Sequence, residues 1–119
     1  MAKIQFLYWE DCPSHPEAWQ LLQEVLAGEG LDWPVERILV AGDLDAQRWD
    51  FPGSPTIRVD GQDLDPGGAA QMGVALACRV YRLDPEEGGR YSPVPSRAMI
   101  RRGLLAARGQ DDQGPAQDG

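Results

Sequence analysis

The chain has 119 residues, the size of one domain, and 42% of them are hydrophobic, as in an ordinary globular protein. No apolar run approaches the ~20 residues of a membrane-spanning helix. A formal net charge of −8 disfavours contact with nucleic-acid phosphates or anionic lipids. We therefore expect one domain, residues 1–108, that binds neither nucleic acid nor membrane.

The first third of the chain predicts a strand, a helix and a second strand. Residues 4–9 are aromatic and aliphatic with little polarity, which is typical of a strand covered on both faces. A helix ending near Gly28 follows. Its apolar residues recur at helical spacing, and they are Ala18, Leu21, Leu22, Val25 and Leu26. Residues 35–40 form the second strand, which the crossover helix places parallel to the first.

The middle of the chain predicts a short helix and two paired strands. Residues 43–51 suit a helix capped by Asp43. Its expected buried side is made by Leu44, Ala46 and Trp49. Residues 56–61 alternate in polarity and stop at an Asp-Gly turn, and residues 74–82 are a second β-rich run, so we expect antiparallel pairing between them. The glycines and proline of residues 65–73 indicate an irregular excursion.

The C-terminal part predicts a last helix and a tail. Ser96 is placed to cap this helix. Its inward face is expected to consist of Met99, Ile100, Leu104 and Leu105. The arginines of the same stretch indicate a solvated helix face, with cations near the helix C-terminus, where they suit the dipole. Residues 109–119 are expected to form a disordered acidic tail.

The start of the chain bears on its compartment. Residues 1–9 read as a strand and have neither the apolar stretch nor the small-residue cleavage site of a secretory signal, which predicts a cytoplasmic protein. In a reducing compartment, Cys12 and Cys78 are expected to be free thiols or a reversible pair. Two cysteines are too few for a four-cysteine zinc site.

The predicted order of elements, β-α-β-α-β-β-α, has a cysteine after the first strand and a Ser-Pro-Thr before the third. This arrangement resembles the thioredoxin superfamily over roughly residues 3–107. Four segments look like those of small bacterial thioredoxin-like proteins, some of them associated with organomercurial lyase. They are Cys12-Pro13, Gly53-Ser54-Pro55-Thr56-Ile57, Asp60-Gly61-Gln62-Asp63 and Ala77-Cys78-Arg79-Val80-Tyr81. The resemblance implies a thioredoxin-like three-layer α/β sandwich with a central mixed four-stranded sheet.

The same resemblance assigns a substrate site to the loop before the third strand. It implies that Pro55 has a cis peptide bond and packs beside the reactive cysteine, the alternative being an ordinary trans Ser-Pro turn. The backbone of Ser54 would then pair with an extended substrate segment, with Thr56 beside it. Trp9 is expected to flank the thiol.

The sequence departs from the thioredoxin pattern at one position. The residue three after Cys12, where the resolving cysteine of a Cys-x-x-Cys pair belongs, is His15. The usual local disulfide is therefore excluded. His15 is the only histidine, and the sequence leaves open whether it assists the thiol or simply lies exposed in the first helical turn.

Cys12 is the predicted nucleophile. A thiol at a helix N-terminus faces unpaired amide donors and the positive end of the helix dipole, and both favour the thiolate. Cys78 is the predicted partner, because the resemblance to the thioredoxin superfamily implies that the fourth strand, which carries it, returns toward the active-site end. Alternation groups Cys78 with Leu76 and Val80, opposite Arg79 and Tyr81, so core packing is its other possible role.

These residues predict a thiol–disulfide oxidoreductase-like protein. Cys12 would attack a thiol or disulfide substrate, with a protein among the candidates, and Cys78 or an external thiol would resolve the mixed disulfide. No cofactor and no resident metal are expected, and the sequence does not indicate an oligomeric state. Two alternatives stay open: a non-enzymatic protein that holds Cu(I) or Hg(II) through Cys12, Cys78 and His15, and an interaction domain whose cysteines only pack.

Overall fold

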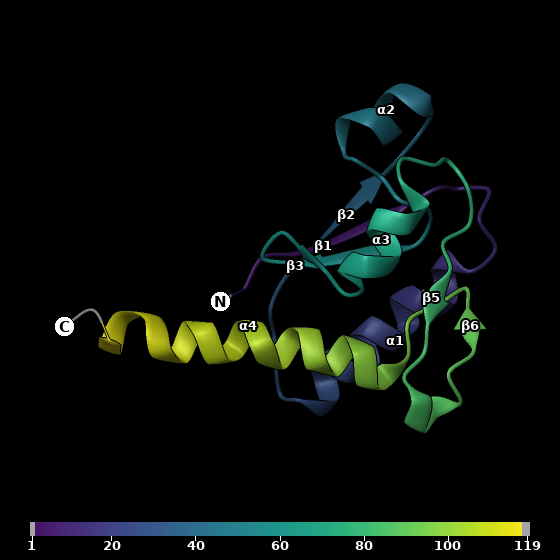
Figure 1. Ribbon diagram of the computed structural model, residues 1–119. Coiled ribbons are helices and arrows are strands. Elements are labelled where there is room, and N and C mark those ends of the chain that lie inside the picture. The colour runs from purple at the N-terminus through teal and green to yellow at the C-terminus, as the bar shows by residue number, and fades with distance from the viewer. Residues whose placement is uncertain (1, 118–119) are drawn as a thin grey trace.

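The computed structural model describes residues 2–117, with side chains described from residue 2 to residue 109. The elements, in chain order, are β1 (Ile4–Tyr8), α1 (His15–Gly28), β2 (Val35–Leu39), α2 (Asp43–Arg48), β3 (Thr56–Val59), β4 (Gln62–Asp63), α3 (Pro66–Met72), β5 (Tyr81–Arg82), the 3-10 helix η1 (Pro85–Glu87), β6 (Tyr91–Ser92) and α4 (Arg97–Gln117). Figure 1 shows their arrangement.

A mixed four-stranded sheet organises the domain, as predicted. Its strand order is β2-β1-β3-β4, with β1 parallel to β2 and antiparallel to β3. Ile4 lies opposite Val35 on one side and Val59 on the other. The predicted first strand, crossover helix and parallel second strand are therefore confirmed, and the fold is α/β.

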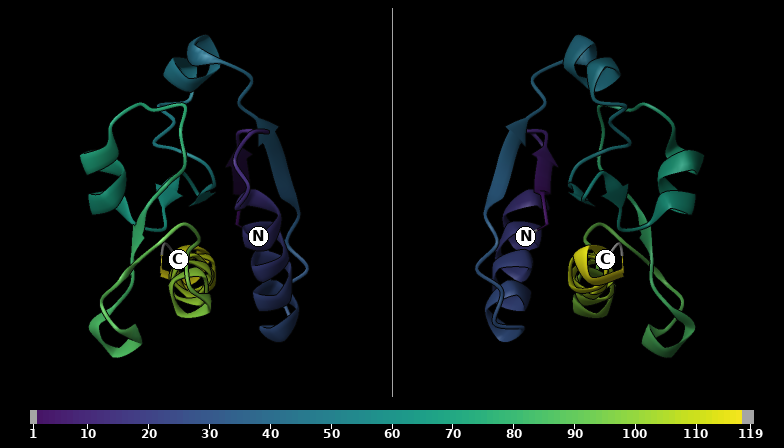
Figure 2. Two further views of the ribbon diagram at one scale, coloured as in Figure 1. Left: turned by 90° about the vertical axis from the view of Figure 1, so that its right-hand side faces the viewer. Right: turned by 90° about the vertical axis from the view of Figure 1, so that its left-hand side faces the viewer.

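The two faces of the sheet carry separate hydrophobic clusters. Helices α1 and α4 lie together along one face (Figure 2), because their apolar stripes meet the alternating inward residues of β1 and β3. The larger cluster includes Phe6, Leu22, Ile57, Ile100 and Leu104. The smaller cluster lies on the opposite face and includes Leu7, Ile38, Val40, Ala46 and Phe51. The β1–α1 loop and the loop before β3 connect elements that are packed into these two clusters.

The Asp60-Gly61 turn ends β3 as predicted, but it leads straight into the partner strand. Both turn residues have positive φ, 52° and 81°, which suits a two-residue hairpin turn. The turn pairs Val59 with Gln62, so β4 takes the sheet edge that the sequence interpretation gave to residues 74–82. The predicted antiparallel pairing of 56–61 with 74–82 is wrong for this reason.

Residues 65–73 form a helix where an irregular excursion was predicted. The Asp65 carboxylate accepts a hydrogen bond from the Gly68 N–H, and Pro66 stands at the first helical position, where its missing donor costs nothing. These two start signals outweigh the glycines. Helix α2 also differs from its prediction: it begins after Gly42 and ends at Arg48, and Leu44 is 82% exposed, not buried.

The C-terminal helix begins as predicted, because the Ser96 hydroxyl accepts a hydrogen bond from the Met99 N–H at 3.1 Å. Before it, β5 and β6 form a small separate hairpin. Helix α4 is assigned through Gln117, but side chains beyond residue 109 are not described. The expected acidic tail, 109–119, falls almost wholly outside the described side chains and stays a prediction.

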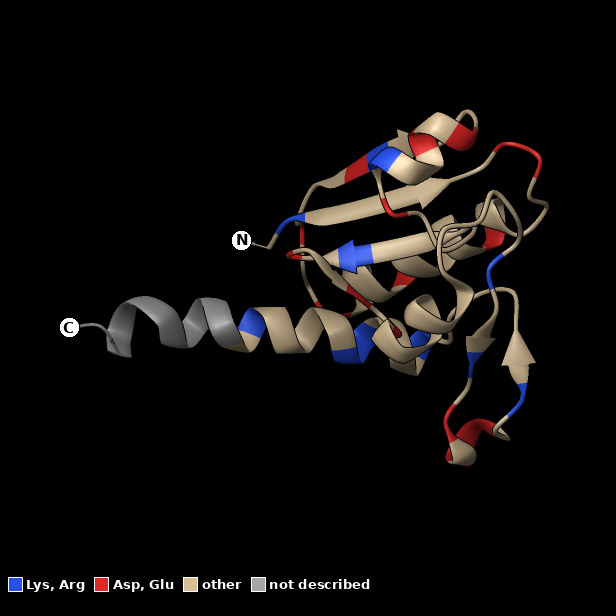
Figure 3. Cartoon of the chain, turned by 45° about the horizontal axis from the view of Figure 1, so that its top comes forward, with Lys and Arg blue, Asp and Glu red and all other residues tan. Residues whose placement is uncertain are grey.

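Basic and acidic residues are distributed along many segments of the chain, as Figure 3 shows. Three arginines of α4 are exposed and pair with acidic residues of other segments: Arg97 with Glu24, Arg101 with Glu29 and Arg102 with Asp84. The predicted solvated helix face is therefore observed, but the predicted position of these cations near the helix C-terminus is wrong, because α4 begins at Arg97 and continues to Gln117. Among the described residues, no helix combines the length and apolar character that crossing a membrane requires.

Candidate functional site

Cys12 lies in the turn between β1 and α1, three residues before the helix begins at His15. Its backbone N–H donates to the Trp9 carbonyl at 3.0 Å, which closes the turn. The Cys12 side chain is only 2% exposed, and its thiol donates to the Ser54 carbonyl at 3.2 Å. The predicted position near a helix start is thus observed, but the thiol is directed at a carbonyl oxygen of another loop.

The Ser54–Pro55 peptide bond is cis, as the resemblance implied. Ser54 is fully buried, and its hydroxyl accepts a hydrogen bond from the Trp9 N–H at 2.9 Å, which ties this loop to the Cys12 turn. Thr56, also fully buried, donates from its hydroxyl to the Gly53 carbonyl at 2.7 Å. These contacts place the predicted substrate loop directly against the predicted nucleophile.

Residues 77–79 run alongside Ser54 as a single parallel β-bridge. The Ser54 N–H donates to the Ala77 carbonyl at 2.8 Å, and the Arg79 N–H donates to the Ser54 carbonyl at 2.7 Å. The backbone groups that the resemblance assigns to a substrate are therefore paired within the chain. Gly53 permits this close approach, since a Cβ there would lie 3.0 Å from the Arg79 Cα, and its φ of +112° also favours glycine.

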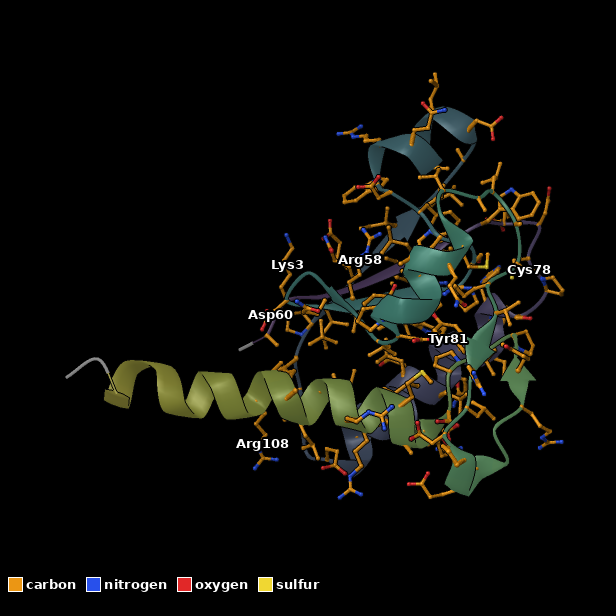
Figure 4. The ribbon with its side chains drawn as sticks, in the orientation of Figure 1. Lys3, Arg58, Asp60, Cys78, Tyr81 and Arg108 are labelled. Atoms are coloured by element: carbon orange, nitrogen blue, oxygen red, sulfur yellow. The ribbon has the colours of Figure 1, made fainter. Side chains whose placement is uncertain are left out.

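This pairing brings Cys78 to Cys12. Both cysteines are free thiols, and one Ser54 carbonyl accepts from the Cys12 thiol and from the residue after Cys78. Partial desolvation of the Cys78 sulfur and the neighbouring Cys12 thiol together raise the pKa of Cys78, although the residue is exposed. Unlike Cys12, Cys78 is exposed. Figure 4 shows Cys78 on the loop between α3 and β5, toward the outside of the domain, with Tyr81 nearer its centre.

His15 and Trp9 lie on the two sides of the Cys12 turn. The His15 ring lies 4.8 Å from the Tyr8 ring, centroid to centroid, and its Nδ1 is buried without a hydrogen-bond partner among the described residues. Trp9 is half-buried and packs against the smaller hydrophobic cluster. Trp9 contributes its backbone to the site, while no hydrogen bond of the described residues links His15 to either thiol.

The alternation expected around Cys78 is reversed. The sequence interpretation grouped Cys78 with the buried side and opposed it to Arg79 and Tyr81, yet Arg79 and Tyr81 are fully buried and Cys78 and Val80 are exposed. The cause is that residues 77–79 pair only with Ser54 and that Arg79 finds a carboxylate partner, Asp63, inside the domain. Burial of an arginine requires such a partner.

Sequence reasoning missed a polar network behind the Ser54 loop. Arg79 donates to the Thr56 hydroxyl at 3.0 Å and to both carboxylate oxygens of Asp63. Its guanidinium also lies 4.4 Å from the centre of the Tyr81 ring, and the Tyr81 hydroxyl donates to the Pro55 carbonyl. The available signal was an arginine inside an otherwise apolar run, downstream of two closely spaced aspartates.

Comparison of the chain with protein-family models, with curated proteins and with solved structures gave no match. The chemistry of the site is therefore argued from its own residues.

Proposed function

We propose that this chain is a thiol–disulfide oxidoreductase-like protein in which Cys12 and Cys78 take the place of a Cys-x-x-Cys pair. One observation carries the proposal: two cysteines 66 positions apart in the sequence are brought together at Ser54, because the Cys12 thiol donates to the Ser54 carbonyl, Cys78 is the β-bridge partner of Ser54, and the Cys12 thiol raises the pKa of Cys78.

The surroundings of the two thiols support the same proposal. The sheet order, the helices on its two faces and the cis Ser54–Pro55 bond fit a thioredoxin-like three-layer sandwich, in which this loop adjoins the reactive thiol. Fold likeness alone would not carry a function. Here the proposal rests on the paired thiols, and the predicted cytoplasmic location would keep them reduced between turnovers.

The reaction would pass two electrons from the thiols to a substrate disulfide. One cysteine forms a mixed disulfide, the other displaces the substrate sulfur, and the protein is left with a Cys12–Cys78 disulfide. Reduction by two equivalents of a low-molecular-weight thiol would restore the starting state. The backbone ties between the Trp9 turn, Ser54 and residues 77–79 would hold both sulfurs in reach of each other.

Oxidation in a glutathione redox buffer tests this proposal. We expect peptide mapping without reductant to find one linked peptide pair joining Cys12 to Cys78, at a reproducible midpoint potential. Cys12→Ser and Cys78→Ser are matched controls, because each leaves one thiol and should give only mixed disulfides with glutathione. Wild-type protein that stays reduced, or that links only between molecules, would contradict the proposal.

Binding of a soft metal ion is the second candidate, since the same two thiols suit Cu(I) or Hg(II). Of the residues that the structure describes, no three His, Cys, Asp or Glu side chains form a metal-binding group, so His15 does not join the cysteines. A two-coordinate thiolate site is the form that fits. Stoichiometric Cu(I) uptake that either serine variant abolishes would support it, provided that the redox test above fails.

A further inference from the structure

The two thiols differ sharply in their access to a substrate. Cys12 is 2% exposed and its hydrogen points at the buried Ser54 carbonyl, whereas Cys78 is exposed. Attack on a disulfide requires the thiolate to approach along the line of the two substrate sulfurs, so access limits the rate. On this ground the exposed sulfur meets the substrate first.

The internal pairing of Ser54 points the same way. The 77–79 segment uses both the N–H and the carbonyl of Ser54, so an incoming peptide has no free backbone there on which to align next to Cys12. The residue at the centre of that segment is Cys78. Val74 and Val80, which precede and follow it, are also exposed, at 49% and 43%, and offer apolar contacts to an incoming molecule.

The raised pKa of Cys78 slows such an attack without preventing it. Partial desolvation and the Cys12 thiol raise the pKa of Cys78, which lowers the fraction of its thiolate at a given pH. A thiolate with a higher pKa is more nucleophilic, and this partly offsets the smaller fraction of Cys78 that is present as thiolate.

We propose that Cys78 makes the first attack on the substrate disulfide and that the buried Cys12 resolves the mixed disulfide. This order reverses the one predicted from the sequence, and it rests on the proposed redox function. In this order Cys78 contacts the substrate. Cys12 carries out only the intramolecular step, for which no other molecule has to reach its sulfur.

The steps balance as follows. Cys78 gives its proton to solvent, and its sulfur bonds to one sulfur of the substrate R–S–S–R′ while R′–S⁻ leaves. Cys12 then loses its proton and bonds to the Cys78 sulfur, and R–S⁻ leaves. The two cysteines are oxidised to a disulfide, and the substrate is reduced to two thiolates that take up two protons at neutral pH.

A chromogenic aromatic disulfide tests the order by stopped-flow absorbance and peptide mass spectrometry. Wild-type protein should release two thiolate equivalents. Cys12→Ser should lose the second equivalent and stop at a stable mixed disulfide on Cys78. Cys78→Ser should release its first equivalent about tenfold or more slowly, because the buried Cys12 reacts only after local opening. A Cys78→Ser rate equal to or above that of Cys12→Ser would overturn the order.

A second measurement uses only wild-type protein, so its result does not depend on whether the serine variants fold. Brief alkylation with iodoacetamide, followed by peptide mapping, should label Cys78 well before Cys12, and both should react alike in urea. Equal or faster labelling of Cys12 in the folded protein would overturn the order. If the glutathione experiment still gives the Cys12–Cys78 disulfide, only the order fails; if no disulfide forms, the proposed function fails.

Discussion

Arg79 and Asp63 form a two-point ion pair inside the domain, with Nη1 2.9 Å from Oδ2 and Nη2 2.7 Å from Oδ1. Burial alone would lower the pKa of Arg79, but the hydrogen bonds and charge of Asp63 outweigh it and hold that pKa above its ordinary value. The Arg79 N–H also donates to the Ser54 carbonyl. The ion pair therefore anchors the segment that carries Cys78.

Asp63→Asn should destabilise the protein by about 3–5 kcal/mol, because it leaves the Arg79 guanidinium buried without a counter-charge. Urea unfolding measures the loss. Glu29→Gln is the matched control: it breaks the Arg101–Glu29 pair, whose arginine is 61% exposed, and should cost less than about 1 kcal/mol. Equal losses in the two variants would mean that the buried pair stabilises no more than a surface one.

Tyr81→Phe should cost about 1–3 kcal/mol, since it leaves the Pro55 carbonyl without its buried donor. The ring itself stays in place over Arg79, so packing changes little. Tyr91→Phe makes the same change on a residue that is 68% exposed and should shift stability by less than about 0.5 kcal/mol. Thermal unfolding of both variants, followed by circular dichroism, compares them. A Tyr81 variant as stable as the Tyr91 variant would contradict this role.

Leu104→Ala and Leu44→Ala should differ although the substitution is the same. Leu104 is fully buried between α4 and the sheet, so its loss should cost about 2–5 kcal/mol. Leu44 is 82% exposed on α2, and its replacement should leave the urea midpoint nearly unchanged. A marked loss for Leu44→Ala would instead support the burial that its sequence pattern predicted.

The parts of the fold that could be predicted from the sequence are those whose structure is determined by residues close together in the chain. The apolar spacing of α1 determines which of its faces meets the sheet, and Ser96 starts α4 through a contact three residues away. Helix α3 was not predicted, because glycines are unfavourable inside a helix and the only start signals are Pro66 and the capping carboxylate of Asp65. Boundaries therefore depended on individual capping side chains.

The candidate site was predictable only in part for a different reason. Cys12 was predicted from its place at the start of a helix, and Ser54 from the resemblance of its Ser-Pro-Thr segment to that of the thioredoxin superfamily. The side on which Cys78 lies depends on Ser54 and Asp63, which are 24 and 15 positions away, and no local pattern shows those contacts. An arginine is almost never fully buried unless it is paired, so the burial of Arg79 could not be predicted before its partner was known.

Alkaline pH should destabilise the domain through two acids that the fold keeps protonated. Burial raises the pKa of the Tyr81 hydroxyl despite the opposing charge of Arg79, and partial desolvation with the Cys12 thiol raises the pKa of the exposed Cys78. Above its ordinary pKa, each group loses its proton in the unfolded chain before it does so in the native state. Stability therefore falls as pH rises, from about 8.5 for the thiol and about 10 for the tyrosine.

Urea midpoints between pH 8 and pH 11 separate the two contributions. Wild-type stability should decline across this range, and Tyr81→Phe should flatten the decline above about pH 10, where one group contributes up to about 1.4 kcal/mol per pH unit. Cys78→Ser should flatten it nearer pH 9. Tyr91→Phe makes the same substitution on an exposed side chain and is the matched control for Tyr81→Phe. A Tyr81→Phe slope that matches wild type would show that Tyr81 ionises as easily in the folded protein as in the unfolded chain, and so would contradict its buried hydrogen bond to Pro55.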